Sequence, residues 1–245
     1  MPALTRRSLL MGAAIWTLAA PARAVKSTAL VSPQMRLAGG DAANPRVALT
    51  FDACDGGVDG RILDLLETAA IPATIFVSGL WLARNKAAFA RLLTRPDLFE
   101  IGNHGARHHA AIDQPMRLWT VPAAGSPAAV GAEVIGGALA IVAAGGVWPV
   151  WFRGATAEYT ATALTEIAAT GFRVAGFSLN GDEGAELDET ATLARYRAAK
   201  DGTIIISHVN QPHRHAGAGV VAGIKALQTR GFGFVRLSGP GVVVV

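Results

Sequence analysis

Three predicted strands in this sequence each end near a side chain that can transfer a proton or bind a metal ion. Residues 47–51 lead directly into Asp52, residues 203–207 lead directly into His208, and residues 99–102 precede His104. The first two are apolar runs of the type expected for a strand buried on both faces. In α/β enzymes, catalytic groups lie where such strands open into loops. A packed core does not need three such strand ends, so the sequence predicts an active site there.

His104 and His108 are four positions apart. If the segment coils, their imidazole nitrogens come close enough to hold one metal ion. An isolated pair of this kind is more often two hydrogen-bonded loop histidines, but Asp52 and His208 favour the metal site. Two histidines and one carboxylate, with a position left open for water, suit a catalytic ion. The sequence therefore predicts a divalent metal ion, with zinc expected.

The elements that must position these side chains alternate between strand and helix patterns. The predicted strands are Val47–Phe51, Thr74–Val77, Phe99–Gly102, Val150–Phe152, Arg173–Phe177, Thr203–Ser207 and Phe234–Leu237. The predicted helices are Gly60–Ala70, Lys86–Thr94, Ala128–Ala144, Thr160–Thr170, Thr190–Ala199 and Gly219–Thr229. This alternation is typical of parallel βαβ units that close into a barrel. With no repeat or internal linker, we expect one domain over residues 46–245, preceded by an extended arm over residues 25–45.

Four motifs, in order, resemble those of the NodB-type polysaccharide deacetylases, carbohydrate esterase family 4. Thr50–Ala53 stands where that family has Thr-Phe-Asp-Asp, and Gly102–His108 matches its Gly-Asn-His-x-x-x-His motif. Phe152–Gly154 matches an arginine at a strand end, and Ile204–His208 matches an apolar strand ending in histidine. The resemblance covers roughly residues 46–237. It implies an α/β fold, a distorted (β/α) barrel of seven or eight parallel strands of the NodB-homology type.

The first motif departs from the family. The family's second aspartate is a metal ligand, and this sequence has Ala53 in its place. Asp55 and Asp59, in the following glycine-rich loop, are the nearest replacements, and one of them is expected to complete the site. Asp59 is equally suited to cap a helix that begins near Gly60, and Asp55 to a turn. Cys54 could also bind zinc, although a small buried thiol is its more usual role.

The resemblance also implies the roles of the other site residues. Asp52 corresponds to the general base that takes a proton from water, and His208 to the acid that protonates the leaving group. Arg153 corresponds to the arginine that orients this aspartate by an ion pair. Asp182, in the segment Asn180-Gly181-Asp182, is expected to orient His208, although this segment is also good turn chemistry.

Two loops are expected at the mouth of the barrel. Residues 107–126 have no clear period and are predicted as a long loop, with Trp119 as a candidate for stacking on a sugar. Residues 210–215 form a polar loop that could contact sugar hydroxyl groups. The tail, 239–245, ends in four valines and is predicted to be an extra edge strand or an arm.

Residues 1–24 have the features of a twin-arginine signal peptide. Arg6 and Arg7 precede an apolar stretch over residues 11–20, and Ala22-Arg23-Ala24 has the small-x-small form of a cleavage site. The apolar stretch is short for a membrane span, so we expect no stable membrane insertion after the signal is removed. The sequence predicts export to the periplasm or the extracellular space.

Charge and cysteine content exclude several classes of partner. Loss of Arg6, Arg7 and Arg23 with the leader lowers the net charge from +4 to about +1. No basic patch remains to indicate nucleic acid or an anionic surface. A single cysteine, Cys54, excludes an internal disulfide framework.

The combined interpretation is a metal-dependent hydrolase that removes N- or O-acetyl groups from an amino-sugar polymer or another carbohydrate. Its amide specificity is for carbon–nitrogen bonds other than peptide bonds. One alternative is a non-catalytic carbohydrate-binding or scaffold protein on a degenerate deacetylase fold, which Ala53 favours. Another is a metal hydrolase of a different small amide or ester. The sequence assigns no oligomeric state.

Overall fold

The computed structural model of the chain describes residues 29–41 and 43–245. The predicted signal peptide, residues 1–24, lies outside the described residues. Among the residues that are described, no helix is both long and apolar enough to cross a membrane.

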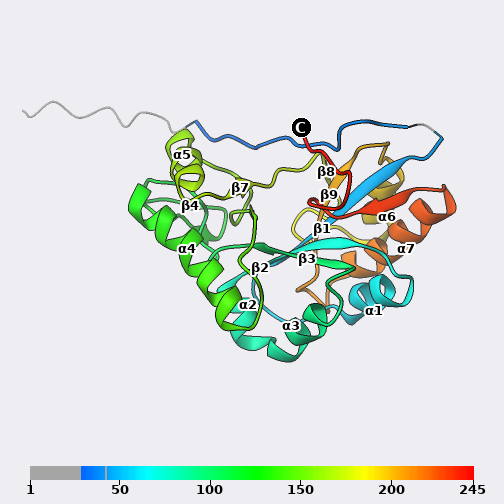
Figure 1. Ribbon diagram of the computed structural model, residues 1–245, viewed down its shortest axis with the longest axis horizontal. Helices are drawn as coiled ribbons and strands as arrows, with labels where there is room; N and C mark the ends of the chain where they lie inside the picture. The colour runs from blue at the N-terminus through cyan, green and yellow to red at the C-terminus, as the bar shows by residue number, and fades with distance from the viewer. Residues whose placement is uncertain (1–28, 42) are drawn as a thin grey trace, which may run out of the picture.

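Parallel strands form the centre of the molecule (Figure 1). The strands are β1 (Arg46–Ala53), β2 (Ala73–Val77), β3 (Phe99–Asn103), β4 (Arg117–Leu118), β5 (Val121–Pro122), β6 (Trp151–Phe152), β7 (Arg173–Val174), β8 (Leu179–Asn180), β9 (Ile204–His208) and β10 (Gly233–Val235). The main sheet has the order β7-β6-β3-β2-β1-β9-β8, and β10 pairs with β1. All pairs in this sheet are parallel, which confirms the predicted distorted barrel of seven or eight parallel strands.

Helices pack on the outer face of this sheet (Figure 1). They are α1 (Gly60–Thr68), α2 (Gly79–Arg84), α3 (Lys86–Leu93), α4 (Pro127–Ala143), α5 (Ala161–Ala169), α6 (Glu189–Arg197) and α7 (Ala216–Thr229). The largest apolar cluster lies between the strands and helices α1, α2, α3 and α7. A second cluster joins α4, α5 and β6. Six of the helices match the predicted ones in place, whereas α2 has only 6 residues and was not predicted.

Strand β1 pairs with three neighbours, and its side chains point alternately into the barrel and out toward the helices. Val47, Leu49 and Phe51 pack into the large cluster under the helices, whereas Ala48 packs into a separate cluster inside the barrel. Because side chains alternate along a strand, Thr50 and Asp52 share the inner face with Ala48. The register then pairs Asp52 with His208 on β9, so both lie at the same level at the carboxyl end of the barrel.

The N-terminal arm pairs with the segment between the two ends of the strand order, and the C-terminal tail pairs with the arm. Gln34 bridges to Phe177, in the segment between β7 and β8, the two ends of the strand order. Arg36 exchanges backbone hydrogen bonds with Val245, so the tail pairs with the arm. The arm also places Met35 and Leu37 in the interior cluster. Backbone pairing and apolar burial therefore fix the described part of the arm, although the sequence shows no period there.

Residues 107–126 are not the continuous loop that the sequence predicts. Strands β4 and β5 form an antiparallel hairpin with Leu118 paired to Val121 and a turn at Trp119-Thr120. Each strand has only 2 residues, too few for a period-2 pattern to be recognised in the sequence. Strand β8, also of 2 residues, was missed for the same reason.

Candidate active site

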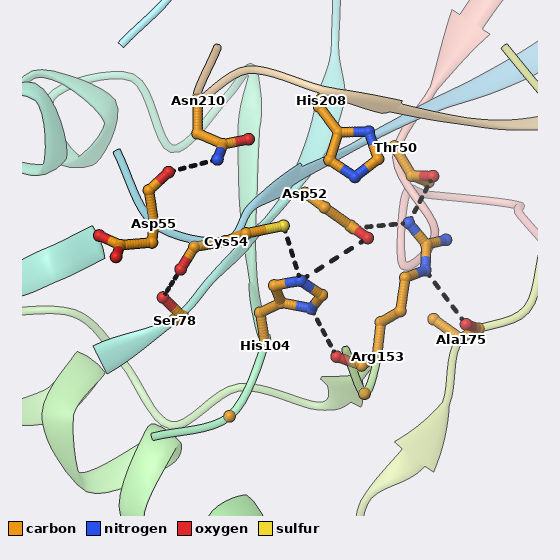
Figure 2. A network of polar contacts seen from close by, with 12 residues as sticks. Thr50, Asp52, Cys54, Asp55, Ser78, His104, Arg153, Ala175, His208 and Asn210 are labelled. Carbon is orange, nitrogen blue, oxygen red and sulfur yellow. Dashed lines mark hydrogen bonds and ion pairs between the residues drawn. The ribbon is translucent and has the colours of Figure 1, made fainter. Parts of the chain in front are cut away.

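Asp52 and Arg153 form a buried ion pair inside the barrel (Figure 2). Nη1 of Arg153 donates to Oδ1 of Asp52 at 3.0 Å and to the hydroxyl of Thr50 at 2.9 Å. Nε donates to the carbonyl of Ala175, Nη2 donates to that of Gly176, and the guanidinium stacks on a phenylalanine ring. Because Arg153 is fully buried and hydrogen-bonded on every side, it is fixed in place, and it fixes one oxygen of Asp52.

The charges around Asp52 favour its ionised form. Burial alone would raise the pKa of this carboxyl group, but the positive groups of His104, Arg153 and His208 outweigh burial and hold the pKa below its usual value. With Oδ1 bonded to Arg153, Oδ2 faces His104, whose Nε2 lies 3.8 Å away. Asp52 therefore offers one unbonded carboxylate oxygen as a proton acceptor at the end of β1.

Cys54, His104 and His108 form a cluster that can hold a metal ion. One ligand atom from each residue lies within 4.8 Å of the others, and Sγ of Cys54 is 3.4 Å from Nε2 of His104. Nδ1 of His104 donates to the carbonyl of Arg153 at 2.7 Å, because a carbonyl can only accept. This bond fixes the ring and leaves Nε2 directed at Cys54, the arrangement that metal-binding histidines usually have.

The electrostatics of this cluster favour a positive charge between its members. Burial alone would raise the pKa of Cys54, but the neighbouring imidazoles outweigh it and lower the pKa well below its usual value, so the thiolate is favoured. Burial would likewise lower the pKa of His104, but Asp52 and Cys54 raise it. A thiolate and two imidazoles with an open side form a donor set that fits zinc.

Glu133 on α4 fixes the loop that carries His108. Its Oε1 accepts from the backbone N–H of Arg107 at 2.8 Å and from that of His109 at 3.1 Å, on either side of His108. His108 has a φ of 57°, in the left-handed region that histidine adopts less readily than glycine. Glu133 is therefore a positioning residue that the motif comparison missed. A signal was present, since Glu133 is the only charged residue in the apolar segment that became α4.

The structure does not bring Asp55 or Asp59 to the histidines. Asp55 pairs with Arg84, and Figure 2 shows its carboxylate directed away from Cys54 and His104. Asp59 caps α1 by accepting from the backbone N–H of Arg61, and it also pairs with the guanidinium of Arg61. For Asp59 the helix-cap alternative is therefore the observed arrangement. The side chain from this loop that does reach the histidines is Cys54.

His208 and Asp182 make the contact that was expected of them. Nδ1 of His208 lies 2.9 Å from Oδ1 of Asp182, and the backbone N–H of His208 donates to Oδ2 at 2.6 Å. Burial alone would lower the pKa of His208, but Asp182 outweighs it and raises the pKa well above its usual value. The pair thus favours a protonated imidazole at the end of the strand beside Asp52, and the neighbouring Cys54 also raises the pKa of this ring.

A cavity of about 790 Å³ opens over these groups. Asp52, Cys54, His104, His108 and His208 all line it. Its walls come from the β4–β5 hairpin, the loop after β6, the segment around β8 and the loop after β9. The loop after β9 contributes Gln211, which belongs to the polar loop predicted at the rim. The cavity has the size usual for small-molecule sites.

The family described as polysaccharide deacetylase matches residues 39–175 of the chain. A family 4 carbohydrate esterase from Streptomyces lividans in complex with acetate is 21% identical, with 81% of this chain and 95% of that chain covered and a TM-score of 0.65. A family 4 pseudoenzyme from Bacillus anthracis is 18% identical over 83% and 66% of the two chains, with a TM-score of 0.66. An acetyl xylan esterase from Clostridium thermocellum in complex with cobalt is 26% identical over 78% and 88%, with a TM-score of 0.63. No curated protein matches the chain.

Proposed function

The chain belongs to the polysaccharide deacetylase family, and from this premise we propose that it is an exported, metal-dependent hydrolase that removes acetyl groups from a carbohydrate. The observation that carries the proposal is the register of β1 with β9. It sets an ionised carboxylate, Asp52, opposite a protonated imidazole, His208, on one cavity. A base and an acid held side by side beside a metal-binding cluster are what hydrolysis of an amide or ester requires.

Cys54, His104 and His108 would hold the metal ion, with zinc proposed because a thiolate ligand disfavours hard cations such as magnesium. When bound, the ion would act as a Lewis acid on the acetyl carbonyl and on a nearby water molecule. The cysteine replaces the carboxylate that the family places one position earlier, at residue 53. Since Cys54 follows Asp52 by two positions, both side chains face the barrel interior.

Asp52 would take the proton from the attacking water through Oδ2, while Arg153 holds Oδ1. His208 would give its Nε2 proton to the departing amine or alcohol, and Asp182 would stabilise the charged ring before that transfer. Asp52 thus gains a proton and His208 loses one during one turnover. Each begins in the state that its neighbours favour.

Release of acetate tests the proposed function. Acetylated chito-oligomers, peptidoglycan fragments and acetyl-xylan are incubated with the zinc-loaded protein, with and without a chelator. We expect acetate from at least one of them, with loss on chelation and recovery on adding zinc. A protein that binds these sugars but releases no acetate would instead be the non-catalytic alternative, a role supported by the family 4 pseudoenzyme of related fold.

The metal site makes a prediction that separates cysteine from carboxylate ligands. Cys54→Ala should weaken zinc binding on the order of a hundredfold or more, because it removes a donor atom from the cluster. Cys54→Asp should retain metal but shift its preference from zinc toward harder cations such as manganese. Competition with a zinc-binding dye measures both affinities.

Asp55→Asn and Asp59→Asn are the matched comparisons, because both acids were candidate ligands in the sequence. Each pairs with an arginine rather than with the histidines, so we expect zinc affinity to change by less than about twofold. If either acid variant loses zinc while Cys54→Ala keeps it, the assignment of the thiolate is wrong.

The opposite pKa shifts of Asp52 and His208 predict a pH profile with two limbs. The pKa of Asp52 is lowered, so activity should fall as acid protonates this base. The pKa of His208 is raised, so activity should fall only as alkali removes the proton of this acid, leaving a maximum around neutral pH. Measurement of kcat/KM for an acetamide substrate, as a function of pH across both limbs, gives the profile.

The substrate's leaving group provides the control for this profile. Nitrophenol leaves without a proton, so nitrophenyl acetate should lack the alkaline limb that the amide shows. His208→Ala should remove the same limb for the amide and lower its turnover. Equal alkaline limbs for both substrates would exclude His208 as the acid.

Export through the twin-arginine route is the remaining part of the proposal. It rests on Arg6-Arg7, the apolar stretch and the Ala22-Arg23-Ala24 site. That route carries folded proteins, which suits a protein whose metal cluster joins side chains from distant parts of the chain. Secretion should stop when both arginines are replaced by lysine.

A further inference from the structure

Trp119 lies at the tip of the β4–β5 hairpin and lines the same cavity as Asp52, His108 and His208. Its side chain is 73% exposed, whereas Phe177, another aromatic residue that lines this cavity, is partly buried. An indole held in water at the mouth of a catalytic cavity leaves a large apolar face without a partner in the described part of the chain.

The backbone of Trp119 is also in an unfavourable conformation. Its φ is 52°, in the left-handed region, and it is the first central residue of a two-residue hairpin turn. Hairpins usually have glycine, asparagine or aspartate at such a position, because a larger side chain there is strained. Neither the local turn nor packing accounts for a tryptophan. Residues kept in such conformations cluster at ligand sites.

Hydrogen bonds fix the hairpin relative to the catalytic groups. The guanidinium of Arg117 donates to the carbonyl of Thr120 and closes the turn. Ala110 bridges both to Ala123, just after β5, and to Ala155, in the loop that follows Arg153. The indole is therefore carried on a supported hairpin joined to the loop that begins at the buried ion pair, and a ligand would not have to order it.

We propose that Trp119 is a stacking platform for a pyranose ring that binds next to the sugar being deacetylated. This inference rests on the proposed function. The C–H groups on one face of a pyranose suit the electron-rich face of an indole, and the sugar hydroxyls remain free for polar groups such as Asn180 and Gln211 in the same cavity. The substrate class is accordingly an acetylated oligomer of pyranoses rather than a single acetylated sugar.

Calorimetric titration of the zinc-loaded protein tests the platform without requiring turnover. The probes are the tetramer of N-acetylglucosamine, an acetylated xylotetraose and monomeric N-acetylglucosamine. For the tetramer that binds to the wild type, Trp119→Ala should raise Kd by about tenfold, because it removes the stacking surface for the sugar. Trp119→Phe should retain most of the affinity, because phenylalanine also offers an aromatic face.

Trp119→Gly separates the platform from a structural role of the residue. Glycine adopts positive φ without strain, so the melting temperature should rise by about 2–4 °C while tetramer affinity falls as it does in Trp119→Ala. Trp148→Ala is the matched control, because Trp148 is 50% exposed but lies before β6, away from this cavity. It should leave tetramer affinity unchanged.

The outcomes distinguish this proposal from the proposed function. If the wild type binds a tetramer through Trp119 but releases no acetate, the platform stands and the catalytic proposal fails. If the wild type releases acetate and Trp119→Ala binds the tetramer as tightly as it does, the platform is wrong. A wild type that binds neither tetramer also overturns it.

Discussion

Asp52→Asn is expected to lower kcat by about 10²- to 10⁴-fold while zinc stays bound. Asparagine has nearly the shape of aspartate, and its side-chain oxygen can still accept the hydrogen bond from Nη1 of Arg153. Its amide nitrogen would then occupy the place of Oδ2, where it cannot accept a proton. The variant therefore removes the proposed base and leaves the cluster of Cys54, His104 and His108 unchanged.

Turnover and zinc content measured on the same preparation check this result. Asp97→Asn is the matched control, because it neutralises an exposed aspartate that pairs with Arg95 on the surface. It should keep full turnover. If Asp52→Asn retains more than about a tenth of the wild-type kcat, Asp52 is not the base. If it loses zinc as well, Asp52 contributes to the metal site.

Arg153→Met is expected to lower the free energy of unfolding by about 3–5 kcal/mol. Methionine approximates the volume of the arginine stem but leaves the carboxylate of Asp52 buried without its cation. It also removes the donors to Thr50 and to the carbonyls of Ala175 and Gly176. Urea unfolding of the metal-free protein measures the loss.

A double-mutant cycle identifies the source of that loss. In Arg153→Met with Asp52→Asn, the buried charge is gone, so the pair of substitutions should cost less than the sum of the single ones, by about 0.5–3 kcal/mol. Arg95→Met, which breaks an exposed pair with Asp97, should change the free energy of unfolding by less than about 0.5 kcal/mol. Strict additivity at Asp52 and Arg153 would mean that the cost is lost packing alone. The double variant should remain inactive, because stability and the base are separate requirements.

The sequence by itself determined the barrel and the level of the site within it. Apolar runs that alternate with helical patterns can bury both faces only as parallel strands covered by helices. The carboxyl ends of such strands meet at one rim, so Asp52, His104 and His208 had to lie near one another. This reasoning needed only local patterns. The family resemblance, rather than these patterns, implied Arg153 and its contact with Asp52.

Only the tertiary structure decided which residue after β1 reaches the histidines. Asp55 and Asp59 had the expected chemistry, but each lies beside an arginine, Arg84 or Arg61, that the sequence could not place. Strand β1 continues to Ala53, and the alternation of its side chains brings Cys54 to the inner face after Asp52. The strand ends at Ala53, two positions beyond the predicted end at Phe51, and this was not visible in the sequence.

The supports of the site depended on tertiary contacts in the same way. Glu133 holds the loop of His108 across 24 and 26 residues of chain, and the strands that hold Trp119 have 2 residues each. Neither a long-range hydrogen bond nor so short a strand leaves a periodic pattern. Periodicity reports which face of an element is buried, whereas these side chains are placed by what lies opposite them once the chain has folded.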